Sequence, residues 1–216
     1  MRVAHPLETP SMVTDPSSAE IQLSGREAAL VGSAYRVISR QGVHRTSLQD
    51  IADDADVSKG LLLYHFKSKD QLLLTTMRWA LLRTASRIRE NIAQVDDHPA
   101  GAVEALIDAV FIGAQQNRDF YLLYLDLVEH AARAPSFSDL SVLTSTIING
   151  LYAEILREGQ SRGLFDITDV DEAAATMRAH IDGVFVNWLQ QHDWRAAYPR
   201  YRAMALNGLL RLLNIK

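Results

Sequence analysis

The 216-residue sequence predicts an all-α fold, in which a small unit of short helices precedes a larger helical domain. From Ser24 onward, apolar residues recur at helical spacing, and no segment shows the two-residue alternation of a strand. Short breaks rich in Asp, Pro and Gly separate the helices, which favours antiparallel neighbours in a bundle. Residues 1–23 contain three prolines and no apolar run, so we expect a disordered leader there.

Composition narrows the possible functions. The chain is 48% hydrophobic and 22% charged, which is typical of a globular protein. It has no cysteine, which excludes disulfides, thiolate metal sites and thiol nucleophiles and fits a reducing cytoplasm. No apolar run approaches the roughly 18 residues of a membrane span. We therefore expect a cytoplasmic protein with no membrane partner.

Net charge does not indicate a nucleic-acid-binding protein. The formal charge is −4, and residues 1–70 carry 8 Lys and Arg against 9 Asp and Glu. Residues 71–216 carry 14 against 17. Any basic surface for nucleic acid must therefore be local.

The first expected helix runs from Ser24 to Gln41. Ser24 suits the N-cap position, Glu27 completes a capping box, and Gly42 ends the helix. A second, short helix is expected to begin at Thr46 or Ser47. Its apolar residues share one face because they are spaced i, i+3, i+4 and i+7; they are Leu48, Ile51, Ala52 and Ala55.

Two further serines mark the next helix starts. Ser58 is expected to cap a third helix that ends near Tyr64, and Ser68 a fourth, with Gln71 as its capping-box partner. Residues 24–70 thus form a three-helix unit whose second and third helices are separated by a tight turn. The remaining chain, 71–216, is expected to form a larger domain with helices near 69–95, 100–117, 118–134, 138–162, 170–191 and 195–214.

Two short helices joined by a tight turn and braced by a first helix are the helix-turn-helix arrangement, which places its second helix in the major groove of DNA. Between Val57 and Lys69 the chain carries three lysines and His65 but no acid. Such a local cationic strip suits a phosphate backbone. The alternative interpretation is a small helical bundle with no partner and solvated lysines.

The segment "TSLQDIADDADVSKGLLLYHFKSKDQLL" resembles the N-terminal signature of the TetR/AcrR family of bacterial transcription regulators. The later stretch "MRAHIDGVFVNWLQQ" is loosely similar to the branch that contains the choline-responsive repressor BetI, a similarity that bears on shape only. The resemblance implies a DNA-binding domain followed by a ligand-sensing and dimerising domain. The matching residues are Ser47, Ile51, Ala52, Ala55, Val57, Ser58, Gly60, Leu62, His65, Phe66, Ser68, Lys69, Asp70 and Leu72, with Arg26, Ala34 and Gly42 before them.

The sequence departs from the family pattern at two positions. Asp56 stands where the family has a turn glycine, and Asp tolerates turn geometry better than most residues. Leu63 stands where the family commonly has a tyrosine credited with a phosphate contact, and Tyr64 follows it. Leu63 has no donor, so we expect Tyr64 to be the residue that takes over this contact.

Side-chain roles follow from the helical spacing and the resemblance together. We assign Val57, Leu62 and Phe66 to the core and expect Lys59, Leu61, Tyr64 and His65 to face outward. Lys59 could donate to a guanine, and Leu61 could pack on a thymine methyl. The candidate DNA-binding residues are Arg45, Thr46, Ser47, Gln49, Ser58, Lys59, Gly60, Leu61, Leu63, Tyr64, His65, Lys67 and Lys69.

Two helices of the larger domain are apolar around most of their circumference, which indicates burial on two sides. We predict that they pair with their copies in a homodimer; a core helix of a large monomer is the alternative. The candidate interface residues are Leu143, Ile147, Leu151, Ile181, Val184, Phe185 and Trp188.

An unidentified small-molecule effector would bind among the helices of 71–134 and 170–191. Polar and aromatic residues on these apolar helices are candidates for its pocket, although each could equally be a core residue. They are Trp79, Arg83, Gln115, Tyr121, Tyr124, Asp126, Glu129, His130, Asn149, Tyr152, His180 and Trp188.

The sequence therefore predicts a dimeric regulator, most simply a repressor, that binds a near-palindromic double-stranded DNA operator and releases it when an effector binds. One alternative is a DNA-binding structural or adaptor protein without an inducer. An all-helical enzyme is the other, but the sequence contains no His-x-x-x-His or Glu-x-x-His pair and no Gly-rich phosphate loop. We expect no cofactor, no metal site and no catalytic residues.

Overall fold

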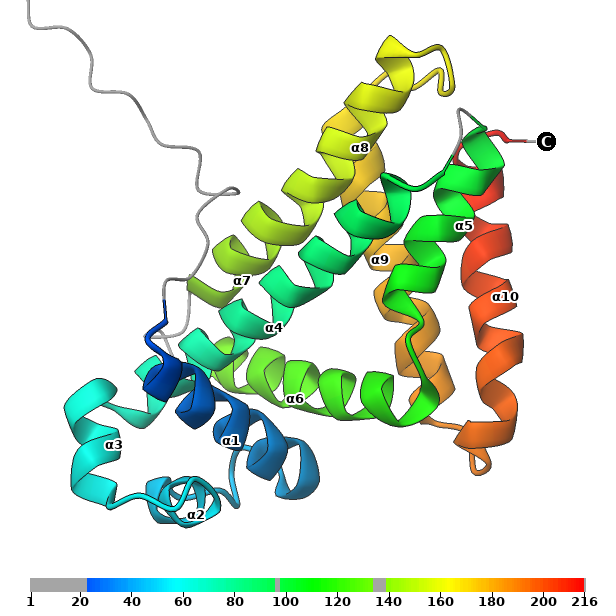
Figure 1. The fold of residues 1–216 in the computed structure, drawn as a ribbon. Helices are drawn as coiled ribbons and strands as arrows, with labels where there is room; N and C mark the ends of the chain where they lie inside the picture. Colours follow the sequence, from blue (N-terminus) through cyan, green and yellow to red (C-terminus); the bar gives the residue numbers. More distant parts are fainter. Residues whose placement is uncertain (1–22, 96–97, 134–138, 216) are drawn as a thin grey trace, which may run out of the picture.

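The computed structural model describes residues 23–95, 98–133 and 139–215, and every regular element in them is a helix. The N-terminal unit contains α1, α2 and α3, followed by the long helix α4 (Figure 1). Their bounds are Gly25–Gln41, Leu48–Asp54, Lys59–His65 and Lys69–Ile92. The later elements are α5 (Pro99–Val110), α6 (Ala114–Arg133), α7 (Asp139–Thr144), the π-helix η2 (Ser145–Asn149), α8 (Gly150–Ser161), α9 (Val170–Leu189) and α10 (Trp194–Leu212).

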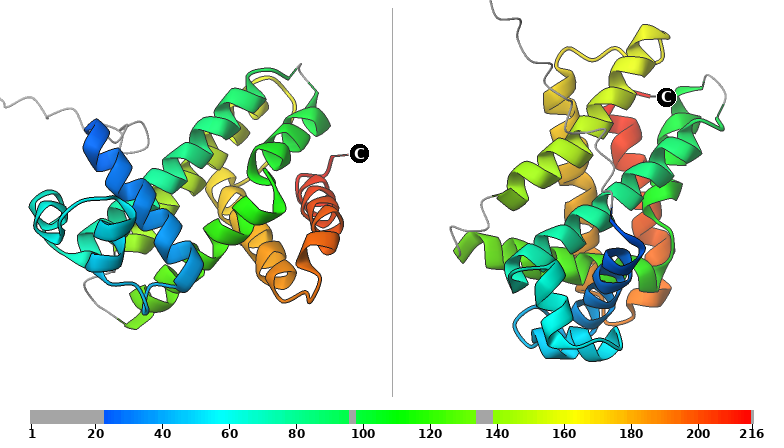
Figure 2. Two further views of the ribbon diagram at one scale, coloured as in Figure 1. Left: turned by 60° about the horizontal axis from the view of Figure 1, so that its bottom comes forward. Right: turned by 60° about the vertical axis from the view of Figure 1, so that its left-hand side comes forward.

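The two domains lie at opposite ends of the molecule. Helices α1 to α3 gather at one end, and α5, α9 and α10 pack at the other (Figures 1 and 2). Helices α4 and α6 join them, because both pack against α1 and both continue into the larger domain. The predicted boundary at residues 70 and 71 therefore falls in the first turn of α4, which belongs to both units.

Predicted caps explain where the N-terminal helices begin. Ser24 and Glu27 form a complete capping box on α1, and Ser47 forms one with Asp50 on α2. Ser58 and Ser68 cap α3 and α4 by accepting from backbone N–H groups three residues on. The Gln71 side chain differs from the expectation, since its Oε1 accepts from Lys67 N instead of Ser68 N.

The helices of the larger domain differ from those predicted in two places. α5 ends at Val110, and the next helix begins at Ala114, because the backbone turns at Gly113, whose N–H donates to the Tyr198 hydroxyl at 3.0 Å. The segment predicted as one helix over 138–162 contains the π turn η2. Pro199 lies inside α10, within the helix predicted near 195–214.

The residues predicted for a dimer interface are instead part of the protomer core. Ile181, Val184, Phe185 and Trp188 on α9 are at most 4% exposed, because α6, η2, α8 and α10 of the same chain pack against this side of the helix. Ile147 and Leu151 are likewise buried, and Leu143 is partly buried. The side of α9 that carries Ala175, Ala179 and Asn187 is exposed. Packing within the chain therefore accounts for the large apolar residues of α9.

The predicted leader lies outside the described residues except for Leu23, which packs against the core. No helix in the described ranges is both long and apolar enough to cross a membrane. In the same ranges, no group of three or more His, Cys, Asp or Glu is arranged to hold a metal ion.

Candidate nucleic-acid interface and internal cavity

The three consecutive leucines of α3 have three different environments. Leu62 is fully buried and packs in the core with Phe66, as predicted from the spacing. Leu61 is partly buried, and Leu63 is 37% exposed. Tyr64 is 80% exposed, so its ring projects from the helix into solvent. Asp56 has φ +52°, which keeps the turn before α3 in the left-handed geometry that glycine usually provides.

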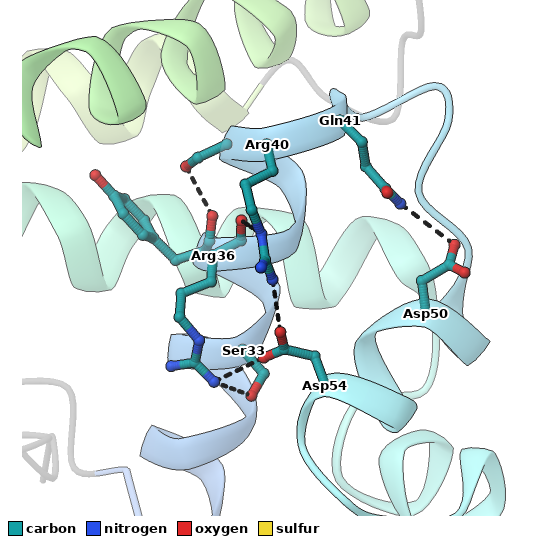
Figure 3. Close-up of polar contacts among 8 residues, drawn as sticks. Ser33, Arg36, Arg40, Gln41, Asp50 and Asp54 are labelled. Atoms are coloured by element: carbon teal, nitrogen blue, oxygen red, sulfur yellow. Dashed lines mark hydrogen bonds and ion pairs between the residues drawn. The ribbon is translucent and has the colours of Figure 1, made fainter. Parts of the chain in front are cut away.

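The carboxylates of α2 are occupied by partners on α1 and within α2. Asp54 accepts from Arg36 at 2.7 Å and from Arg40 at 2.6 Å, and Figure 3 shows both guanidinium groups converging on it. Burial raises the pKa of Asp54, but these two hydrogen bonds outweigh it and hold the pKa below its ordinary value. The negative charge of Asp54 is therefore paired with α1.

The exposed surface of α3 and its flanking loops is basic. Lys59, Lys67 and Arg45 are exposed, and within the described residues none of the three forms an ion pair. Gly60 is exposed and has only the Ser58 hydroxyl near its Cβ position, so backbone here is open to a close approach. Ser47 and Ser58 are exposed but use their hydroxyls as helix caps, and the exposed Gln49 donates to Asp53 at 2.6 Å.

Three of the predicted DNA-binding side chains are turned inward instead. Thr46 is 3% exposed, because its hydroxyl donates to Gly42 O inside the turn at 2.7 Å. Lys69 is partly buried, and its ammonium donates to Val43 O at 2.6 Å. His65 lies against α1, with Nδ1 3.6 Å from Glu27 Oε1. These residues brace the N-terminal unit from within.

An internal cavity of about 260 Å³ lies in the larger domain beside this unit. Its lining comes from α1, α4, α6, α9 and the α7–α8 segment, together with Val110 and Ile112. Aromatic rings form much of the wall; they belong to Tyr35, Trp79, Phe120, Tyr121, Tyr124 and Tyr152. Such a chamber, largely apolar with a few polar groups, is typical of a small-molecule site.

A partly buried carboxylate is the main acceptor on the cavity wall. Asp182 accepts from the Tyr121 hydroxyl at 3.0 Å and from the Tyr124 hydroxyl at 3.4 Å, and Arg178 Nε lies 3.9 Å away. Burial raises the pKa of Asp182, while these three neighbours oppose the rise. Burial also raises the pKa of Tyr124 to about 12, so its phenol is a neutral donor.

Five of the predicted pocket residues line this cavity: Trp79, Arg83, Tyr121, Tyr124 and Tyr152. The structure places the others elsewhere. Trp188 is fully buried and donates to Trp194 O, His180 packs against Ala205 and Gly208 of α10, and Gln115 accepts from Arg195. Asn149 donates to Ser145, and three candidates on the later part of α6, Asp126, Glu129 and His130, face the N-terminal unit.

Sequence reasoning missed several lining residues. Tyr35 belongs to the first domain by its position in the sequence, and Arg87 belongs to a run of arginines that could simply be solvated. Arg178 and Asp182 could have been identified from the sequence, because they are oppositely charged and lie four residues apart on a helix that is rich in apolar residues.

Helix α6 connects the cavity to the N-terminal unit. Its first half contributes Phe120, Tyr121 and Tyr124 to the lining. Its second half contacts the turn after α1, where Asp126 Oδ2 accepts from Val43 N at 3.0 Å and Glu129 lies 2.8 Å from His44 Nε2. A movement of α6 in response to a bound molecule would therefore act on this turn.

Two family models match the chain. Residues 30–76 match the bacterial regulatory proteins of the tetR family, and residues 99–214 match the C-terminal domain of BetI-type transcriptional repressors. The first match spans the helix-turn-helix unit, and the second spans more than half of the chain.

The chain is similar to two curated regulators and to one solved structure along most of its length. The transcriptional repressor KstR2 of Rhodococcus jostii is 29% identical over 178 residues, which cover 82% of this chain and 86% of that protein. The transcriptional regulator BetI of Serratia proteamaculans is 25% identical and covers 84% of this chain and 88% of its own. A Saccharomonospora viridis protein assigned as a transcriptional regulator, solved in complex with choline, superposes with a TM-score of 0.71 at 24% identity over 86% of this chain and 95% of its own. The protein therefore belongs to the TetR family of bacterial transcriptional regulators, with a C-terminal domain of the BetI type.

Proposed function

We propose that this regulator is a homodimeric repressor that binds a near-palindromic operator through α3 and releases it when a small molecule occupies the internal cavity. The observation that carries the proposal is the position of α6, which lines the cavity with its first half and holds the turn before α2 with its second. A bound molecule and the DNA-binding unit would thus both contact the same helix, α6.

The surface of α3 supports the DNA-binding part. In this proposal Lys59 contacts a base edge in the major groove, and Lys67 and Arg45 contact phosphates on either side. All three side chains are exposed. Tyr64 is 80% exposed, more than any other large hydrophobic side chain described in this unit, so it is the better candidate for the phosphate contact that Leu63 cannot make. The inward-facing Thr46, His65 and Lys69 would act by holding α3 in position.

The cavity supports the effector-responsive part. It offers a partly open, largely aromatic volume with converging polar side chains, whereas a DNA-binding adaptor without an inducer would need no such space. The choline complex of the Saccharomonospora protein is a precedent for a small molecule within this fold. Tyr35 of α1 is itself part of the lining, so an occupant would touch the DNA-binding unit directly.

Two exposed apolar side chains on α10 support a dimer interface there. Met204 and Leu212 are each 41% exposed, and neither is among the described residues that line the cavity. Light scattering should therefore give twice the protomer mass at micromolar concentration, and Met204→Glu combined with Leu212→Glu should give a monomer. Val142→Glu is the matched control, because this side chain is 64% exposed but lies on α7. A monomeric wild type, or a Val142 variant that dissociates while the α10 variant does not, would contradict this interface.

In vitro selection from a random double-stranded DNA library tests the DNA-binding proposal and identifies the operator in the same experiment. We expect enrichment of an inverted repeat whose half-sites are about one helical turn apart, or a multiple of it. The variant Lys59→Ala with Tyr64→Ala should enrich nothing while it keeps the wild-type circular dichroism spectrum. Failure of the wild type to enrich any sequence at low salt would refute the proposal.

A further inference from the structure

The cavity wall has an excess of positive charge. Arg83, Arg87 and Arg178 contribute three guanidinium groups to the lining, and Asp182 is the only carboxylate among the lining residues. A local excess of positive charge in a partly buried site is costly unless an anion or solvent compensates it. The charge of the lining residues therefore influences which class of molecule the cavity accepts.

The three arginines differ in how far their donors are already used. Arg87 donates to Ala109 O at 3.3 Å and to Thr84 at 3.1 Å, so it is anchored on α4. Arg178 Nη1 is buried without a hydrogen-bond partner among the described residues. Arg83 is exposed, and its guanidinium lies 4.8 Å from the centre of the Trp79 ring, with no hydrogen-bond or ion-pair partner in the described chain.

Two of the groups that could attract a cation are, by contrast, already engaged. The Asp182 carboxylate accepts two phenol hydrogen bonds and faces Arg178. The Trp79 ring already has the Arg83 cation near its centre, so an organic cation would have to displace it. A cation entering this space would also meet three guanidinium groups.

From these positions we infer that the effector is a small organic acid, whose carboxylate or similar anionic head group pairs with Arg178 and Arg83 while its apolar body packs against the aromatic wall. This inference rests on the proposed function, since it names the class of molecule that would occupy the proposed effector site. A guanidinium binds a carboxylate through two parallel hydrogen bonds, which satisfies donors that are otherwise unused. The cavity volume of about 260 Å³ is roughly nine times the 30 Å³ that a water molecule occupies in the liquid, which suits a small acid.

Two matched series of probes test the charge of the head group. One consists of 4-phenylbutanoate, 4-phenylbutanamide and 4-phenylbutylamine, and the other of octanoate, octanamide and octylamine. Calorimetry or thermal shift on the full chain without DNA should show an acid binding at least about tenfold more tightly than its amide, the effect expected of a charge-assisted pair. The amine should be the weakest member of its series.

Variants of this chain test which residues set the preference. Arg178→Gln should bring the affinities for acid and amide to within a few fold of each other, whereas Asp182→Asn should tighten acid binding because it removes the opposing charge. Arg89→Gln is the matched control: Arg89 lies on α4 outside this cavity and pairs with Glu154, so the preference should persist. The binding affinities of a variant are compared with those of the wild type only if the two melting temperatures agree within a few degrees.

Tighter binding of the amine, equal binding of acid and amide, or no binding of either acid at millimolar concentration would overturn the inference. Loss of acid binding in Asp182→Asn would overturn it as well. Acid binding is measured in the absence of DNA, so its result does not depend on the result of the operator selection. A protein that selects an operator but binds no acid would refute the effector class alone.

Discussion

The Asp126 carboxylate accepts a hydrogen bond from Val43 N at 3.0 Å and so ties α6 of the larger domain to the turn between α1 and α2. Gly42 makes this approach possible: its φ is +84°, and a Cβ there would lie 2.9 Å from Asp126 Oδ2. The other side of the same turn is held by Lys69, which donates to Val43 O. The turn is thus held between the first residue of α4 and the second half of α6.

Asp126→Ala should loosen this turn. Removing the acceptor leaves Val43 N–H unpaired in a partly buried site, which costs about 1–3 kcal/mol of unfolding free energy. Hydrogen exchange should show loss of protection at the Val43 amide, and any effector-dependent change in operator affinity should shrink. Asp119→Ala is the control on the same helix, because Asp119 accepts from Gln115 and makes no hydrogen bond to the turn. An equally protected Val43 amide in Asp126→Ala would contradict this coupling.

Lys69→Ala and Lys67→Ala should separate a structural lysine from a DNA-facing one. Lys69 is partly buried, and burial lowers its pKa, while Asp70 and Asp50 oppose the shift. Its loss leaves Val43 O without this donor, so we expect the melting temperature of the free protein to fall by several degrees. Lys67 is exposed, and its loss should leave the melting temperature unchanged while operator binding weakens. Equal melting temperatures for the two variants would refute the distinction.

Tyr64→Phe tests whether this side chain has taken over the contact that Leu63 cannot make. Removal of one hydroxyl that bonds a phosphate should weaken operator binding by roughly 1 kcal/mol, or about fivefold. Adding Leu63→Tyr to the Tyr64→Phe variant should restore the affinity, since both positions are exposed on α3. Fluorescence anisotropy with the selected operator measures both. Unchanged binding by Tyr64→Phe would exclude the contact.

Acid should weaken the attachment of α2 to α1. The pKa of Asp54 is lowered in the folded protein, so its ion pairs contribute stability above its unfolded pKa, and this contribution is lost as the pH falls through the folded value, below about pH 4. Urea unfolding between pH 6 and pH 3, monitored at α1 and α2, should therefore show a smaller acid-dependent loss of stability in Asp54→Asn than in the wild type. The variant Arg36→Met with Arg40→Met should behave in the same way while it keeps Asp54. A wild-type acid dependence in both variants would argue against the pairing.

Much of the N-terminal unit follows from local sequence. Ser24, Ser47 and Ser58 each cap the helix predicted for them, and Asp56 adopts the turn geometry predicted for it, because caps and turns depend on neighbouring residues. The direction of a long side chain does not follow in this way. Lys69 and Lys67 are equivalent in sequence, and only the position of Val43, distant along the chain, turns one of them inward.

The sequence predicts the helices of the larger domain, but it does not predict which partners their individual residues contact. Its helices were expected, yet an all-round apolar helix such as α9 cannot reveal whether its partners belong to the same chain or to a copy. The cavity was expected among these helices, and five of its lining residues were identified from sequence. Which charged residues face it depends on how α4, α6 and α9 pack. The Arg178 and Asp182 pair could have been found from its spacing, whereas Tyr35 could not.

Operator binding as a function of salt tests the central claim most directly. The wild type should bind the selected operator with an affinity that falls steeply as salt rises, because Lys and Arg side chains that pair with phosphates release counterions. Lys67→Ala should reduce the slope of log affinity against log salt by about 0.9 for each phosphate that is no longer neutralised, whereas Arg89→Gln, remote from α3, should leave it unchanged. Binding that is absent at low salt, or that does not respond to salt, would contradict the assignment of α3 and its flanking lysines as the DNA-binding surface.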